Sequence, residues 1–319
     1  RLIRHPLVER NLLRLNTASD WITAKIVILV LDLAKKLPPE RSTTVAEKIA
    51  RKLAPVLPRY KLAKDNIQIT FPEKSPEEVE EIARGVWGNV ARTMCEYVFL
   101  DQLFDFDPDN PHAGRVEVSG IENFLKIRDS RKPVVIFTAH TGNWEILPIA
   151  AATYDLNVTA LFRTPNNRFL AERLLKARTT DRGHLVPSRA GAAWALADVL
   201  SNDQPVGLLA DQAFAAGPHI EFLGRTAAAN PLAANLARQY DCDIHPARCI
   251  RLPYGRFRLE LADKIDLPRT ASGEVDVVAT TDKLNTIIGG WIQEYPDQWL
   301  WLHNRWKIPY PERKKWKRK

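Results

Sequence analysis

The sequence predicts an α/β fold, with a mostly parallel sheet flanked by helices and an N-terminal helical membrane-associating module before it. Three observations lead to this prediction. Residues 133–139 (PVVIFTA) form a continuous apolar run, which is typical of a strand buried on both faces. From residue 144 onward, short apolar segments alternate with helical patterns, as expected for strands joined by crossover helices. The first hundred residues contain only helical patterns.

The N-terminal elements follow from proline positions and one capping signal. Residues 20–60 are predicted to be helical, with breaks at Pro38-Pro39, Pro55 and Pro58. A long helix is predicted to follow, because Ser75 is a suitable N-cap and Pro76 fits the first helical position. The Asp- and Pro-rich stretch 101–113 is predicted to be a loop.

The remaining elements follow from the alternation of patterns. Strands are predicted at residues 115–119, 133–139, 157–162, 184–187, 205–210, 244–252 and 256–261. Helices are predicted at residues 144–153, 167–178, 190–200, 231–240 and 276–295, and a glycine- and alanine-rich loop is predicted up to residue 229. The predicted domains are a helical module at 1–114 with an interfacial membrane helix, an α/β domain at 115–307, and a basic tail at 308–319.

Composition narrows the class of protein. The 319 residues are 45% hydrophobic and 26% charged, which excludes a disordered chain. The three cysteines have no metal-ligand spacing, so a disulfide framework and a structural zinc site are not expected. The net charge of +8 is concentrated at the two ends, with eight basic residues and one acid from residue 303 to 319. Basic ends predict a phosphate-bearing partner such as nucleic acid, an anionic membrane or a phosphorylated substrate.

Residues 21–33 (WITAKIVILVLDL) are the most apolar stretch of the chain. Lys25 and Asp32 interrupt it, and a spanning helix needs about 20 apolar residues. We therefore expect an interfacial helix with its apolar face in the lipid surface. The alternative is an ordinary packed N-terminal helix.

A candidate catalytic pair follows the first buried strand. His140 leaves the end of that strand, Asn143 can cap the next helix, and Glu145 lies in its first turn. Ligands of open α/β sheets bind beyond the carboxyl ends of the strands. If the intervening turn brings Glu145 back to the imidazole, the carboxylate orients the ring and the other nitrogen acts as a general base. The alternative is a purely structural His/Glu pair.

Three further candidates follow other strand ends. Arg163 comes after the strand at 157–162 and suits an oxyanion or a phosphate, whereas Asp211 and Gln212 come after the strand at 205–210. The alternatives are a surface arginine and a helix-capping aspartate. Residues 299–307 interleave aromatic and basic side chains, which suits a lipid interface, nucleic-acid stacking, or a buried final strand.

Several motifs, in order, resemble the late lipid A acyltransferases, the lauroyl and myristoyl transferases of Gram-negative envelope synthesis. The resemblance covers about residues 20–310 and rests on DNIQITFPEKSPEE (65–78), TAHTGNWE (138–145), LFRTPNN (161–167), GLLADQ (207–212), FLGR (222–225) and PDQWLWLHNRWK (296–307). The sequence departs from the family pattern after FLGR, where it reads TAAANPLAANLA, and its N-terminal apolar segment is shorter than usual.

The resemblance implies acyl transfer from acyl carrier protein to a hydroxyacyl hydroxyl of Kdo2-lipid IVA or its acylated product. It implies that the protein is located at the cytoplasmic face of the bacterial inner membrane and that an anionic membrane surface is a partner. It implies no nucleic-acid partner, no cofactor and no metal. The implied catalytic residues are His140 and Glu145, with Arg163 and Asn143 at the oxyanion or phosphate. The implied substrate-binding residues are Asp211, Gln212, Arg225, His303 and Arg305.

Two other classes remain open on the sequence. One is a related membrane acyltransferase that acts on another glycolipid or a phospholipid. The other is a non-catalytic protein that binds anionic lipid or nucleic acid through its basic ends. The second leaves the TAHTGNWE block without a purpose.

Overall fold

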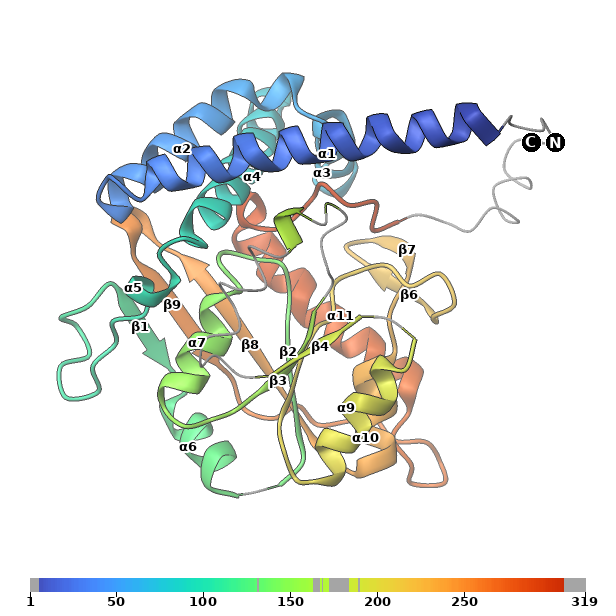
Figure 1. The fold of residues 1–319 in the computed structure, drawn as a ribbon. Helices are drawn as coiled ribbons and strands as arrows, with labels where there is room; N and C mark the ends of the chain where they lie inside the picture. The colour runs from blue at the N-terminus through green and yellow to red at the C-terminus, as the bar shows by residue number, and fades with distance from the viewer. Residues whose placement is uncertain are drawn as a thin grey trace.

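A computed structural model describes residues 6–130, 132–162, 167, 169–171, 184–188 and 190–306, with side chains described from residue 17 onward. Its centre is a seven-stranded sheet with the order β1-β9-β8-β2-β5-β3-β4 (Figure 1). All neighbouring strands are parallel except β8 and β9, which pair antiparallel. The predicted mixed α/β fold with a mostly parallel sheet and flanking helices is confirmed.

The strands agree with the predicted positions to within about two residues. They are β1 (Val116–Ser119), β2 (Val134–Thr138), β3 (Thr159–Phe162), β4 (His184–Pro187), β5 (Val206–Leu209), β8 (Asp243–Arg251) and β9 (Phe257–Leu261). Alternate residues of β2 point to opposite faces, so Val135 and Phe137 enter the main core while Ile136 faces the other side. This strand is buried on both sides, as its continuous apolar run predicts.

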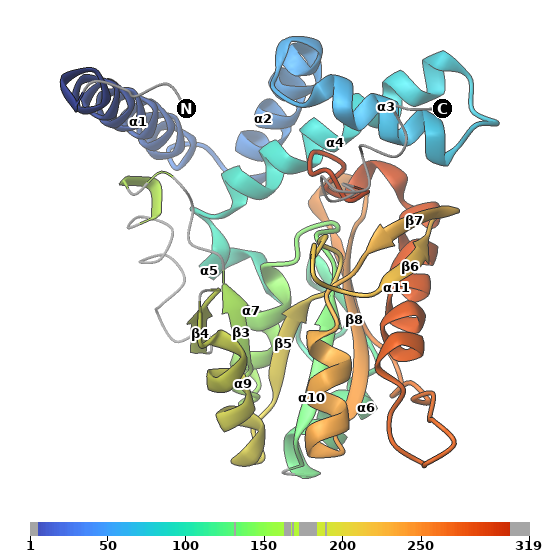
Figure 2. The same ribbon diagram turned by 90° about the vertical axis from the view of Figure 1, so that its right-hand side faces the viewer.

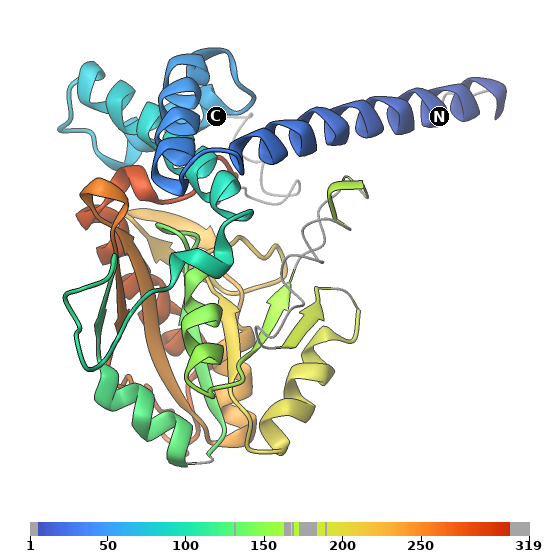
Figure 3. The same ribbon diagram turned by 60° about the vertical axis from the view of Figure 1, so that its left-hand side comes forward.

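Helices cover both faces of the sheet. One face packs against α9 (Ala192–Ser201), α10 (Leu232–Tyr240) and α11 (Val277–Glu294) (Figure 2). The other carries α6 (Ile121–Ser130), which the sequence patterns do not predict, and α7 (Ile146–Thr153) (Figure 3). The predicted helix at 167–178 lies largely outside the described residues.

The N-terminal helices lie across the edge at which β2 ends (Figure 1). They are α1 (Pro6–Ala34), α2 (Pro39–Leu53), α3 (Tyr60–Thr70), α4 (Pro76–Glu96) and the short α5 (Leu100–Leu103). Ser75 caps α4 with a capping box, because its hydroxyl accepts the backbone N–H of Glu78 while its own N–H donates to the Glu78 carboxylate. Ile67 of α3 and Val86 of α4 belong to the same core cluster as Phe137 of the sheet.

Two segments differ from the predictions. The predicted loop before residue 229 contains a β-hairpin, β6 (His219–Phe222) and β7 (Arg225–Ala228). Its turn, Leu223-Gly224, has both φ angles positive, the conformation that matches the twist of a two-residue hairpin. Residues 299–306 form turns, so the buried final strand that was one alternative for this block is not present there, and a single bridge joins Trp299 to Thr141.

None of the described helices combines the length and the apolarity that crossing a membrane requires.

Candidate active site

His140 and Asp211 meet at the carboxyl ends of two neighbouring strands. The parallel register pairs Thr138 of β2 with Leu209 of β5, so the residues that follow both strands emerge side by side. The ring Nδ1 of His140 lies 2.9 Å from Oδ1 of Asp211, and the backbone N–H of His140 donates to Oδ2 at 3.0 Å. A carboxylate only accepts hydrogen bonds, so Nδ1 carries the hydrogen and Nε2 presents its lone pair.

Asp211 is enclosed completely. It has no exposed surface, and its Oδ2 also accepts the indole N–H of Trp299 at 2.8 Å. Burial by itself raises the pKa of the Asp211 carboxyl, but the charge and hydrogen bonds of His140, together with His303, outweigh it and hold the pKa below its ordinary value. Asp211 is therefore a charged partner of His140, and its side chain has no surface with which to touch a substrate directly.

The Nε2 side of the imidazole lies away from Asp211. The side chain of His140 is 13% exposed, and Nε2 lies 3.4 Å from the amide nitrogen of Gln212. The ring packs edge-on against Trp144, with 4.9 Å between ring centroids. This geometry leaves Nε2 as the nitrogen that can take a proton from a substrate hydroxyl.

Glu145 does not supply the hydrogen bond to His140 that the sequence spacing suggested. Its Oε1 accepts the hydroxyl of Tyr97 at 2.6 Å and the indole N–H of Trp144 at 2.8 Å. The orienting carboxylate at Nδ1 is Asp211 instead. Strand order explains why Asp211 and not Glu145 bonds the imidazole. Because β5 lies beside β2, Asp211 lies next to His140, whereas the turn at 141–144 places Glu145 at the start of α7.

Asn143 is used to hold the turn. Its Oδ1 accepts the backbone N–H of Glu145 at 3.1 Å, and its Nδ2 donates to Glu96 at 2.8 Å. The side chain is fully buried. Arg163, the predicted oxyanion or phosphate residue, lies outside the described residues.

The remaining predicted substrate contacts lie near the hairpin β6–β7. Arg225 donates to Asn66 at 3.2 Å and stacks over the ring of Trp306 at 4.2 Å. His303 packs against Trp299, with ring centroids 5.1 Å apart, and its two ring nitrogens have no hydrogen-bond partner among the described residues. Burial lowers the pKa of His303, although Asp211 opposes this shift.

Arg305, an implied substrate-binding residue, lies in the core. Its side chain has no exposed area, and it donates to the carbonyl of Ala228 and to Oδ1 of Asn285, both at 2.8 Å. Burial lowers its pKa to about 10. The neighbouring Trp299, Trp301 and Trp306 pack against one another as part of the main core, and the Arg305 guanidinium lies over the ring of Phe222.

An apolar cavity of about 390 Å³ lies between the sheet and the helices α6 and α7, and its lining reaches Trp144, which packs against His140. Thr138, Trp144 and Glu145 line it at the edge where β2 ends, and Phe124 and Leu125 of α6 line it further along the sheet. The small residues Ala160 and Gly207 lie on the same face and leave room above the strands. An apolar space of this size suits a hydrocarbon chain.

The described residues contain no group of three or more His, Cys, Asp or Glu side chains that could hold a metal ion. The three cysteines are buried and unpaired, and burial raises the pKa of each thiol, which makes them poor nucleophiles.

The family model for bacterial lipid A biosynthesis acyltransferases matches residues 9–308, almost the whole chain. No individual curated protein matches the sequence.

Proposed function

Because the chain belongs to the bacterial lipid A biosynthesis acyltransferase family, we propose that it acylates a hydroxyacyl hydroxyl of Kdo2-lipid IVA, or of its acylated product, using acyl carrier protein as the donor. The single observation that carries the proposal is the position of His140 and Asp211 beside an apolar cavity. A base with one nitrogen outside the bond to Asp211 and a space for a hydrocarbon chain are the two parts that direct acyl transfer to a hydroxyl requires.

In the proposed reaction, Nε2 of His140 removes the proton from the acceptor hydroxyl. The hydroxyl oxygen forms a bond to the thioester carbonyl carbon, and Asp211 stabilises the imidazolium that results. The tetrahedral intermediate collapses by breaking the carbon–sulfur bond. The leaving sulfur takes the proton from His140, which returns the imidazole to its starting state.

The other site residues have supporting roles in this proposal. Glu145 lines the cavity beside Trp144, whose indole N–H it accepts, and so holds the ring that packs against His140. Arg163 is the proposed oxyanion or phosphate ligand, whereas Asn143 acts by holding the turn. Gln212, Arg225 and His303 are the proposed acceptor contacts. Arg305 holds the end of β7 in place through its hydrogen bond to the carbonyl of Ala228.

The apolar cavity is the proposed site of the acyl chain. Each methylene group that leaves water for this space contributes about 0.8 kcal/mol to binding. Residues that line it extend from the end of β2, at the catalytic pair, to Gly120 and α6 at the opposite end of the sheet. A chain that lies along this path places its carboxyl end at His140.

The exposed apolar surface of α1 and α2 is the proposed contact with the cytoplasmic face of the inner membrane. On α1, Ile22, Ile26, Leu29, Val30 and Leu33 are each more than half exposed. Their spacing places them along one side of the helix. Val45, Ile49 and Leu53 of α2 are spaced four residues apart and are about half exposed. An apolar surface together with basic chain ends attracts an anionic bilayer.

Polar substitutions on this surface are expected to weaken membrane binding. Ile26→Ser combined with Leu29→Ser removes two side chains that each contribute about 1.5–3 kcal/mol when fully buried. We expect vesicle affinity to fall at least about tenfold, measured by sedimentation with vesicles of phosphatidylethanolamine and phosphatidylglycerol. Val278→Ser, at an equally exposed apolar residue of α11, is the matched control and should bind normally. Equal binding by the double variant and the wild type would contradict the placement.

Acyl transfer in vitro tests the proposed function. Purified protein is given acyl carrier protein loaded with chains of several lengths and Kdo2-lipid IVA in detergent, and the products are read by mass spectrometry. We expect an acceptor that is heavier by one acyl chain, with one preferred length. A folded protein that acylates only a phospholipid would move the assignment to another acceptor, and the absence of any product would refute the proposal.

A further inference from the structure

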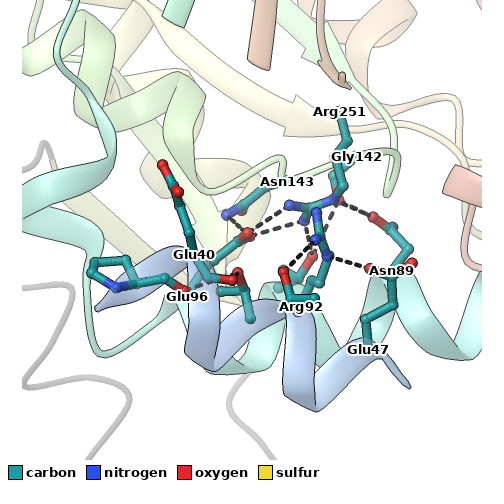
Figure 4. Close-up of polar contacts among 12 residues, drawn as sticks. Glu40, Glu47, Asn89, Arg92, Glu96, Gly142, Asn143 and Arg251 are labelled. Atoms are coloured by element: carbon teal, nitrogen blue, oxygen red, sulfur yellow. Dashed lines mark hydrogen bonds and ion pairs between the residues drawn. The ribbon is translucent and has the colours of Figure 1, made fainter. Parts of the chain in front are cut away.

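A buried ion pair lies behind the catalytic turn. Glu96, the last residue of α4, and Arg251, the last residue of β8, are 3% and 8% exposed at their side chains. Two hydrogen bonds join them, of 2.5 Å and 2.9 Å (Figure 4). Burial by itself lowers the pKa of Arg251, but the Glu96 carboxylate outweighs burial and raises it, so the guanidinium stays charged.

The acidic half of the pair holds Asn143. The Glu96 carboxylate accepts Nδ2 of Asn143 at 2.8 Å, and the other end of that amide accepts the backbone N–H of Glu145 at 3.1 Å. The chain of bonds therefore runs from Glu96 to Glu145, the N-cap residue of α7. It fixes the far side of the turn that starts at His140.

The basic half of the pair holds Gly142 through two residues of α4. Arg251 donates to Asn89 at 2.9 Å and to Thr93 at 3.2 Å, and both of these side chains donate to the carbonyl of Gly142 at 3.2 Å. Figure 4 shows Arg251 and Asn89 beside Gly142. Gln298 joins the same network, because its carbonyl accepts the N–H of Gly142 and its side chain bonds both backbone groups of Arg251. We call this network of Glu96, Arg251, Asn89, Thr93 and Gln298 the polar frame.

The backbone of the turn packs tightly against β8 at Gly142. Gly142 has a φ of +57°, and a Cβ at this position would lie 2.1 Å from the carbonyl oxygen of Cys249. The backbone therefore lies directly against β8 in a conformation that favours glycine. Any loosening of the polar frame shifts the segment that carries His140 at one end and Glu145 at the other.

We propose that Glu96 and Arg251 are positioning residues that hold the His140–Glu145 turn in its catalytic geometry, an inference that rests on the proposed acyl transfer. Buried ion pairs stabilise proteins weakly compared with apolar residues of similar volume, so geometry is the benefit that this pair provides. A displacement of about 1 Å in a reacting group lowers turnover by about 100-fold. Neither residue lines the cavity, so the effect falls on kcat and leaves KM unchanged.

The chain supplies a matched control one helical turn away. Arg92 of α4 pairs with Glu47 of α2 at 2.7 Å, and Glu47 also lies near Arg51 (Figure 4). This second ion pair joins the same helix to α2 instead of to the catalytic turn. Glu47→Gln therefore removes an ion pair of similar chemistry from the same region, and it should leave kcat within about twofold of wild type.

The experiment compares kcat and KM for acyl transfer in Glu96→Gln, Arg251→Lys and Glu47→Gln, well below the Tm of each variant. Glu96→Gln and Arg251→Lys are expected to lower kcat about 100-fold while KM changes less than threefold. Thr93→Val removes the bond to Gly142 and the bond from Arg251 but keeps the Glu96–Arg251 ion pair, so it remains informative if the charge variants fail to fold. It is expected to lower kcat by about threefold to tenfold.

Hydrogen exchange of the free protein gives a readout that does not depend on the substrate. The backbone N–H groups of Gly142 and Glu145 are expected to exchange faster in Thr93→Val and Glu96→Gln, and at the wild-type rate in Glu47→Gln. If the wild-type protein were inactive but the variants showed this exchange pattern, the proposed function would be refuted. The inference that Glu96 and Arg251 hold the turn would stand. The positioning role would be overturned if Thr93→Val and Glu96→Gln kept the wild-type exchange rates and the wild-type kcat. It would also be overturned if Glu47→Gln showed the same changes as these two variants.

Discussion

His140→Ala is expected to lower kcat for acyl transfer by at least about 10³-fold, because it removes the only proposed proton acceptor for the substrate hydroxyl. The ring contacts Asp211, Gln212 and Trp144 at the edge of the sheet and is not part of the main apolar core. The fold should therefore persist. Turnover by mass spectrometry, with circular dichroism on the same samples, measures both effects.

The alanine variant leaves Asp211 buried with one fewer partner, so a second variant is needed. His140→Gln keeps a side-chain N–H that can reach Asp211 and supplies no base. It should be as inactive as His140→Ala but more stable to heat. His219→Ala, at an exposed residue of β6, is the control and should be fully active. Turnover within tenfold of wild type in the folded His140→Gln variant would remove His140 from the mechanism.

Asp211→Asn is expected to lower kcat by about 10³-fold to 10⁴-fold with little change in structure. The carboxylate accepts three hydrogen bonds, from the ring of His140, its backbone N–H and Trp299. An asparagine that keeps the latter two turns its NH₂ group toward Nδ1, so Nδ1 accepts and the hydrogen moves to Nε2. The nitrogen that faces the substrate then carries a proton and no longer acts as a base, the same consequence as in serine-protease triads.

Stability is expected to respond to pH in a defined direction. The pKa of Asp211 is lowered in the folded protein, so its charged form contributes stability above the unfolded-state pKa of about 3.9. That contribution is lost as pH falls through the lower folded-state pKa. Wild type should therefore lose stability relative to Asp211→Asn below about pH 4, measured by denaturant unfolding at pH 7 and pH 3.

Asp203→Asn is the matched control for the substitution, because Asp203 is exposed in the turn before β5. It should have wild-type turnover. An Asp211→Asn enzyme that turns over nearly as fast as wild type would show that the bond to Nδ1 is dispensable. In that case the charge of Glu145 would carry the role that we assign to Asp211.

Local signals in the sequence were reliable predictors of the elements. Ser75 caps α4 as expected, Pro38-Pro39 separates α1 from α2, and Pro55 follows the end of α2. The buried run at 133–139 forms the central strand, so His140 was correctly placed at a carboxyl end. These signals act within about four residues, which is the range that a helix cap or an apolar run covers.

The hairpin β6–β7 shows where local signals failed. Its strands are only four residues long, and alanine and glycine in the segment indicated a loop. Ile220 and Phe222 become buried against the core that residues 299–306 help to form. Burial supplied by distant residues thus decided the conformation of this segment, which its own composition does not favour.

The sequence by itself determined the α/β class, the family, and the position of His140 at a strand end. Only the tertiary structure decided that Asp211 and not Glu145 binds the imidazole, that Arg305 is buried, and that Glu96 pairs with Arg251 behind the turn. The physical reason is strand order: β5 lies beside β2 although two strands separate them in the chain. Partners brought together in this way, 71 residues apart for His140 and Asp211 and 155 apart for Glu96 and Arg251, leave no periodic trace in the sequence.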